Sequence, residues 1–115
     1  MLGTYCQTEL GHGTFLRGIE TTATLDHDTD EFVIHSPTLS SIKFWPGGLA
    51  FSTTHAVVMA RLLIGAKDHG PNMFMVQLRS TQDGTPLPGI RLGDVGLKMS
   101  YAIVAPHYRF LLTYN

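Results

Sequence analysis

Glycine and hydroxyl residues crowd one stretch near the N-terminus, and this combination can hold a phosphate-bearing ligand. The stretch is YCQTELGHGTFLRG, residues 5–18, in which Thr8-Glu9 precedes Gly11, Gly13 and Gly18. Glycines this close together indicate a backbone that turns sharply or lets another group approach closely. The residues alone leave two interpretations open, an ordinary loop between strands or a cradle for a cofactor phosphate.

Three other kinds of reactive residue give weaker signals. The six histidines show no HxxxH or HxH spacing with acidic partners, so no metal site is predicted, because zinc needs converging ligands. Cys6 is the one cysteine and has no sequence neighbour that would lower its pKa, which predicts an inert, buried thiol. Lys43 lies in a short apolar run and is predicted to face solvent from a strand.

Short runs of strand-forming residues, separated by turn residues, must position these groups. Residues 20–37 predict a hairpin with its turn at Asp26–Asp30, and residues 39–45 predict a strand that leads into Pro46-Gly47-Gly48. Residues 54–65 fit either a helix or a long strand. Residues 72–80 predict a strand with Phe74, Val76 and Leu78 on one face, and residues 81–96 are rich in turns, with an extended piece at Ile90–Leu92. The spacing predicts an all-β fold, a small antiparallel β-barrel or sandwich.

Length and composition limit the function classes. The 115 residues suffice for one domain, and a net charge of −1 with scattered Lys and Arg gives no footprint for nucleic acid. The longest apolar run, AVVMARLLIG, is interrupted by Arg61 and is too short to span a bilayer. No signal peptide and no C-terminal peroxisomal signal are visible, and a single cysteine suits a reducing compartment. We expect a soluble intracellular domain without nucleic-acid or membrane partners.

Three motifs carry a resemblance to a known family. CQTELGHGT (residues 6–14, followed by Gly18), SPTLSSIKFWPGG (residues 36–48) and PLPGIRLGDVGLK (residues 86–98) occur in order. Together they resemble the middle β-domain of the acyl-CoA dehydrogenase and acyl-CoA oxidase flavoenzymes. Gln7, His12 and Phe15 depart from the dehydrogenase wording and match the peroxisomal acyl-CoA oxidase branch. The resemblance fails after Tyr101, so residues 1–101 are predicted to form an FAD-contacting β-domain and residues 102–115 a tail outside the family pattern.

The resemblance implies a function for the full enzyme. Acyl-CoA oxidases oxidise fatty acyl-CoA to trans-2-enoyl-CoA in peroxisomal β-oxidation, reduce O2 to H2O2, and work as homodimers with FAD. The family's catalytic base and helical domains lie outside the matched region, so no catalytic residue is predicted here and the isolated chain is expected to be inactive. Glu9 is interpreted as a loop-ordering carboxylate. An exposed apolar patch is expected where the helices would cover the β-domain.

The resemblance also implies a set of cofactor contacts. It aims the Thr8 hydroxyl at the flavin ring, brings Gly13-Thr14 to the pyrophosphate, stacks Trp45 near the flavin and presents the Gly47 backbone to it. Each of these residues also has a structural reading, as a strand residue, a turn or a core aromatic. Tyr5, Cys6 and Gln7 complete the predicted FAD contacts, and Arg17 could meet a phosphate of coenzyme A or FAD or simply be solvated. The alternative function is a non-catalytic β-barrel remnant or binding module without a cofactor.

Overall fold

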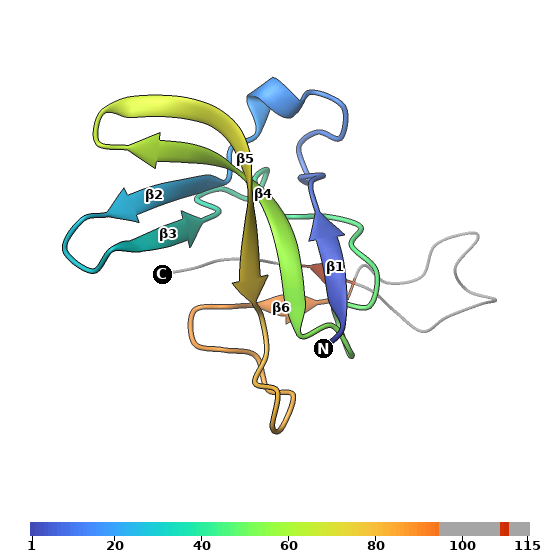
Figure 1. Ribbon diagram of the computed structural model, residues 1–115. Coiled ribbons are helices and arrows are strands. Elements are labelled where there is room, and N and C mark those ends of the chain that lie inside the picture. The colour runs from blue at the N-terminus through green and yellow to red at the C-terminus, as the bar shows by residue number, and fades with distance from the viewer. Residues whose placement is uncertain (95–108, 111–115) are drawn as a thin grey trace.

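The computed structural model describes residues 1–94 and 109–110, and these form an all-β structure (Figure 1). No α-helix occurs among the described residues, so the predicted all-β class is confirmed. The elements are β1 (Gly3–Cys6), a 3-10 turn η1 (Leu16–Gly18), β2 (Thr22–Asp26), β3 (Glu31–His35), β4 (His55–Ile64), β5 (Lys67–Gln77), β6 (Leu92–Gly93) and β7 (Arg109–Phe110). The predicted tail, residues 102–115, lies outside the described residues except at β7.

The long strand β4 organises the main sheet. It pairs antiparallel with β5 along one edge, whereas β1 and β2 share its other edge, and both run parallel to it. Gly3 lies opposite His55, and Thr22 lies opposite Arg61. The segment between β1 and β2, residues 7–21, therefore leaves the sheet and returns to the same edge of β4.

Local chemistry explains the two hairpins. In the turn between β2 and β3, the Asp28 N–H donates to Asp26 Oδ1 at 2.9 Å, and Asp30 adopts a φ of 56°. The predicted hairpin is confirmed, with β2 and β3 in antiparallel register. Residues 54–65, which fitted a helix or a strand, contain β4, and its side chains alternate in burial as a strand requires. The hairpin turn between β4 and β5 places Gly65 at a φ of 58°.

Two features of the predicted fold are wrong. Residues 39–45 do not form a strand, because Thr38 and Ser41 bond each other's backbone: each hydroxyl accepts from the other residue's N–H, at 3.0 and 3.1 Å. Such bonds offer the backbone an alternative to a sheet ladder. The sheet is also not wholly antiparallel, since β1 and β2 run parallel to β4. The predicted barrel stays a prediction, because the described strands do not close the sheet: β1, β3 and β5 each pair with a single neighbour.

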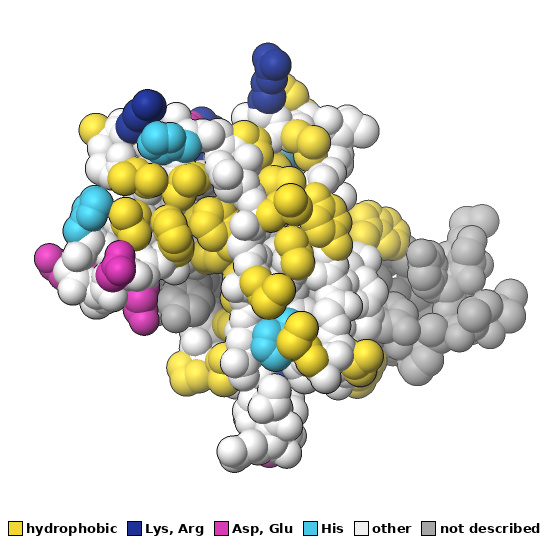
Figure 2. All heavy atoms as spheres, in the orientation of Figure 1, with side chains coloured by type: hydrophobic (Ala, Val, Ile, Leu, Met, Phe, Trp, Pro, Cys, Tyr) yellow, Lys and Arg dark blue, Asp and Glu magenta, His cyan; other side chains and the backbone are white. Residues whose placement is uncertain are grey.

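One face of the sheet carries the core, and the other is exposed. The predicted strand over residues 72–80 is confirmed in β5, where Phe74 and Val76 pack against the core and Leu78 follows them, fully buried. On the opposite face Met73 and Met75 are largely exposed, and Figure 2 shows hydrophobic side chains spread over this region of the surface. The buried core residues are Cys6, Ala23, Ile34, Leu49, Ala56, Val58, Ala60, Leu78 and Ile90.

No helix of the described chain has the length and apolar character needed to cross a membrane.

Candidate functional site

The first two sequence motifs lie side by side, although some thirty residues separate them in the chain. The Phe44 N–H donates to the Thr8 carbonyl at 2.8 Å, and the Leu10 N–H donates to the Ile42 carbonyl at 2.7 Å. A third bond joins the Gly11 N–H to the carbonyl of residue 40 at 2.9 Å. These bonds make residues 7–11 and 40–44 one unit. We call it the paired segments.

A buried ion pair fastens the paired segments. Lys43 Nζ lies 3.0 Å from Glu9 Oε1, and both side chains are fully buried. The carboxylate also accepts the N–H groups of Glu20 and Thr21, each at 2.9 Å, and the Thr21 hydroxyl at 2.6 Å. Glu9 therefore orders the loop, as predicted. The prediction that Lys43 faces solvent is wrong, because its ammonium finds acceptors inside, at Glu9 and at the Gln7 carbonyl.

The ion pair shifts the ionisation of both partners. Burial by itself would raise the pKa of Glu9, but the hydrogen bonds from Glu20 and Thr21 and the charge of Lys43 together hold it below its ordinary value. Burial lowers the pKa of Lys43, and the Glu9 carboxylate offsets only part of this effect. The carboxylate is thus strongly held in its charged form.

Three of the residues predicted to contact flavin, Thr8, Gly13 and Trp45, lie in the paired segments or within two residues of them. Thr8 is half-buried, and its hydroxyl makes no hydrogen bond to any of the described residues. Gly13 lies next to it: a Cβ built on Gly13 would be 3.7 Å from Thr8 Cγ2. Trp45 follows Phe44, stands edge-on to it with ring centroids 4.8 Å apart, and is about half exposed. Its φ of 77° is a strained conformation for a side chain of this size, and such strain concentrates at ligand sites.

The glycines of the two motifs divide into two kinds. A Cβ on Gly11 would lie 2.9 Å from Ser40 Cβ, so packing favours glycine there. A Cβ on Gly18 would meet the Phe15 ring at 2.3 Å, and this exposed ring would have to move. Gly48 has a φ of 73°, which favours glycine by itself. By contrast, Gly13 has only an ordinary contact, and a Cβ on Gly47 would meet nothing within 4 Å. The described residues therefore give a reason for glycine at Gly11 and Gly48, whereas they leave Gly13 with an ordinary contact and Gly47 with open space.

The remaining predicted contacts differ in their exposure. Tyr5 donates its hydroxyl to Gln7 Oε1 at 2.8 Å and is half exposed, and Arg17 is exposed in η1. The Cys6 side chain is fully buried in the core, and burial raises the pKa of its thiol to about 12. Its sulfur is therefore inert, as predicted, and only the backbone of Cys6 could meet a ligand. Thr14 is exposed beside Gly13.

Two arrangements of polar side chains in the structure were not predicted from the sequence. Glu9, His12 and Glu20 place ligand atoms within 4.8 Å of one another. However, both carboxylates already accept hydrogen bonds, and the Lys43 ammonium would oppose a cation, so the cluster carries no metal assignment. The second is Arg79, a buried residue that donates to the Leu49, Ala50 and Gly84 carbonyls at 2.9, 2.6 and 3.0 Å. No motif signalled Arg79, whereas the apolar neighbours of Lys43 in SIKFW were an available sign of burial.

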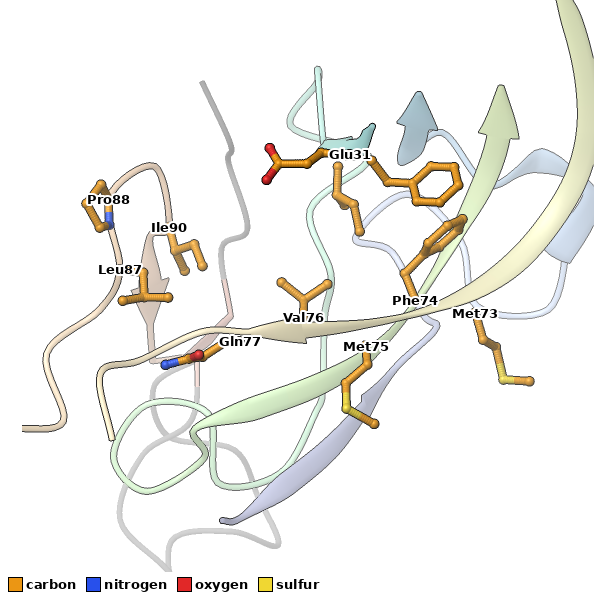
Figure 3. A pocket seen from close by; sticks show the side chains of 11 residues that line it. Glu31, Met73, Phe74, Met75, Val76, Gln77, Leu87, Pro88 and Ile90 are labelled. Carbon is orange, nitrogen blue, oxygen red and sulfur yellow. The ribbon is translucent and has the colours of Figure 1, made fainter. Parts of the chain in front are cut away.

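An apolar groove lies apart from the predicted flavin residues. It has a volume of about 800 Å³ and runs between β3, β5 and the loop before β6. Figure 3 shows Phe74 and Val76 pointing to one side of β5 and Met73 and Met75 to the other. None of the predicted cofactor contacts lines this groove. The paired segments are therefore the candidate site.

Comparison with known proteins gives one consistent family. The chain is 59% identical over 98 residues to a putative peroxisomal acyl-coenzyme A oxidase 1.2 of Arabidopsis thaliana and 57% identical over 101 residues to peroxisomal acyl-coenzyme A oxidase 2 of Mus musculus. This chain matches a segment of the peroxisomal acyl-CoA oxidases. The matches cover 85% and 88% of this chain but 15% of each relative, so the chain spans about a seventh of the acyl-CoA oxidases that it matches. No family model matches it.

Solved structures of acyl-CoA oxidases have the same fold over this segment. The tomato enzyme superposes with a TM-score of 0.91 at 55% identity, covering 98% of this chain and 17% of its own. Acyl-CoA oxidase-1 of Caenorhabditis elegans, complexed with FAD and ATP, gives 0.89 at 50% identity, with coverages of 98% and 17%. Acyl-CoA oxidase-2 of the same organism, bound with FAD, ascaroside-CoA and ATP, gives 0.82 at 50% identity, with coverages of 84% and 15%. The relatives with bound FAD make a flavin the ligand against which the candidate site must be tested.

Proposed function

We propose that this chain is the flavin-contacting β-domain of an FAD-dependent acyl-CoA oxidase. The whole enzyme would oxidise a fatty acyl-CoA to the trans-2-enoyl-CoA in fatty acid β-oxidation and pass the electrons to O2, giving H2O2. The sequence matches and the FAD complexes of the structural relatives support the proposal. The names of the relatives also support a peroxisomal location. The family resemblance extends the proposal to a homodimer and to a domain that closes into a small barrel or orthogonal sandwich.

One observation of this structure fits the cofactor. A Cβ on Gly13 would make only an ordinary contact with Thr8, and one on Gly47 would meet open space, so the described residues do not require glycine at either position. The absence of a Cβ permits close approach of the backbone to a ligand. The Thr8 side chain reaches Gly13 with its methyl group, and its hydroxyl, without a partner in the described chain, is a small, rotatable donor. The residues present therefore suit a large, flat cofactor with phosphates.

Each residue would have a defined part. When bound, FAD supplies the hydride acceptor that the oxidation of an acyl thioester needs. The Thr8 hydroxyl would donate to the ring, where a fixed dipole stabilises developing negative charge. Trp45 would stack against the ring, and Gly13, Thr14 and Gly47 would present backbone N–H groups or a hydroxyl. Tyr5, Gln7 and the Cys6 backbone would line the approach, and Arg17 would meet a phosphate.

The isolated chain should not catalyse the reaction. Oxidation of an acyl thioester needs a positioned base and a site closed to bulk water, and the family's base lies outside the matched segment. FAD bound by the isolated chain would keep only part of its contacts, so we expect affinity weaker than about micromolar. Peroxide released from palmitoyl-CoA in the presence of FAD should not exceed that of free FAD. A higher rate would contradict this division of labour.

The decisive test replaces the hydroxyl at Thr8. In the Arabidopsis relative, Thr→Val at the matching position removes one donor at nearly constant volume. It should weaken flavin binding or transition-state stabilisation by roughly 1–3 kcal/mol, the cost of a lost polar partner. The matched control is a replacement by valine at the position of Thr24, which is an exposed strand residue in this chain. Equal flavin affinity and turnover in both variants would refute the assignment of Thr8 to the flavin contact.

A further inference from the structure

The strongest unassigned feature of the site is how Lys43 touches the chain on both sides of Thr8. Its Nζ lies 3.2 Å from the Gln7 carbonyl and 3.0 Å from the Glu9 carboxylate. The next residue, Phe44, donates its N–H to the Thr8 carbonyl at 2.8 Å. Three consecutive residues of the first motif are thus held by two consecutive residues of the second.

We propose that Lys43 is the positioning residue of the flavin-contacting segment. This inference rests on the proposed function, since it assigns the ammonium the task of fixing where the Thr8 hydroxyl and the neighbouring Gly13 lie. Lys43 does not touch the cofactor. It acts through the backbone of Gln7 and the carboxylate of Glu9.

Stability alone does not account for the ion pair. An apolar pair of similar volume is often as stable as a buried ion pair, because removing two charges from water costs several kcal/mol each. What the charged pair adds is directed hydrogen bonding. An apolar pair could fill the same space but could not hold the Gln7 carbonyl. The fully buried positions of both side chains keep water from substituting for either partner.

The same ion pair connects the site to the rest of the sheet. Glu9 accepts the N–H of Thr21, which immediately precedes β2, so the ammonium is linked through one carboxylate to the return point of the loop. A loop held at both ends and clamped in the middle has little freedom to shift its hydroxyl. Catalytic and binding groups require this kind of support, since a misplacement of 1 Å can cost about a hundredfold in rate.

The first experiment uses this 115-residue chain and needs no cofactor. Lys43→Met should speed hydrogen exchange of the Leu10 and Phe44 amides at least tenfold more than that of the β2–β3 hairpin amides, because the local loss of the Lys43 contacts adds to any general loss of stability. Lys67→Met, at an exposed lysine in β5, is the matched control and should change neither group. Exchange at Leu10 and Phe44 that rises no more than that of the hairpin in Lys43→Met overturns the proposal.

The second experiment separates positioning from folding. In the Arabidopsis relative, a Glu→Leu and Lys→Met double variant at the positions of Glu9 and Lys43 replaces the ion pair with an apolar one and should keep the enzyme folded. We expect the absorbance band of bound flavin to shift and kcat to fall about tenfold or more, with KM within about threefold. A folded double variant with native spectrum and kcat overturns the proposal. If Thr→Val at the position of Thr8 is also without effect, the proposed function fails as well. If that variant is impaired, only the positioning role fails.

Discussion

Replacing Glu9 with glutamine is the sharpest test of the buried network. The change keeps the shape of the side chain but removes its charge and turns one oxygen into an N–H donor. The carboxylate accepts from the Glu20 N–H, the Thr21 N–H and hydroxyl, and Lys43. An amide can accept at one oxygen only, so a donor is left facing a donor, and the Lys43 ammonium is left buried without a counter-charge.

The cost follows from that arrangement. Breaking a buried ion pair by removing one partner destabilises a protein by about 3–5 kcal/mol. A domain of this size is stable by about 5–15 kcal/mol, so the variant should lose a third or more of its free energy of unfolding. Urea unfolding, followed by the fluorescence of Trp45, the only tryptophan, measures the loss. Low protein concentration is needed, because the exposed apolar face predicts self-association.

Glu31→Gln is the matched control, because Glu31 is exposed at the start of β3. It should change the free energy of unfolding by less than about 0.5 kcal/mol. A loss below about 1 kcal/mol in Glu9→Gln would refute the reasoning, since it would mean that water or another group already compensates the Lys43 charge.

Three further outcomes are expected. The folded-state pKa of Glu9 lies below its ordinary value of 4.5. The charged carboxylate therefore contributes fully to stability above pH 4.5, and this contribution is lost as pH falls through the folded-state pKa. Between pH 6 and pH 3 the urea midpoint should fall less steeply in Glu9→Gln than in the unchanged chain, and parallel curves would contradict this. With a pKa of about 12, the Cys6 thiol is ionised at pH 8 in on the order of one molecule in ten thousand. An aromatic disulfide reagent should therefore label it only after urea unfolding, and rapid labelling of the folded chain would disprove its burial. Gly11→Ala should destabilise the chain by about 1–3 kcal/mol, because its Cβ would lie 2.9 Å from Ser40 Cβ, whereas Gly13→Ala should change stability by less than about 0.5 kcal/mol; equal thermal midpoints for the two variants would contradict the division of the glycines.

Local patterns predicted the elements that local chemistry determines. The acidic turn between β2 and β3 and the alternation of Phe74 and Val76 both depend on residues a few positions apart, and both predictions are confirmed. Residues 54–65 stayed ambiguous, because Ala, Met and Leu suit a helix. Pairing with β5 along nearly the whole length of β4 resolves the choice in favour of a strand.

The error about residues 39–45 was local, since it came from the bonds between Thr38 and Ser41, whereas the other two errors arose where distant segments meet. Lys43 looked like a solvent-facing lysine because its partner, Glu9, lies far away in the chain and is brought to it only by the paired segments. The parallel pairing of β1 and β2 with β4 has no local signal either, since parallel partners must come from remote parts of a sequence. The cofactor contacts of Thr8, Gly13 and Trp45 came from family resemblance, and they stay predictions. The structure adds that Thr8 and Gly13 are neighbours and that the N–H of Phe44, the residue before Trp45, donates to the Thr8 carbonyl.

The shared edge of β4 has a consequence for the order of folding. The β2–β3 and β4–β5 hairpins form from neighbouring residues, whereas the pairing of Gly3 with His55 and of Thr22 with Arg61 must close long stretches of chain. Closing long loops is slow, because the chain loses conformational entropy before the new contacts stabilise it. Residues 7–21 connect β1 with β2, the two strands that make these late pairings, so this loop should be the last part of the sheet region to fold. A molecule able to accept cofactor would then be one whose hairpins have already docked, and cofactor uptake would select fully assembled chains from partly folded ones.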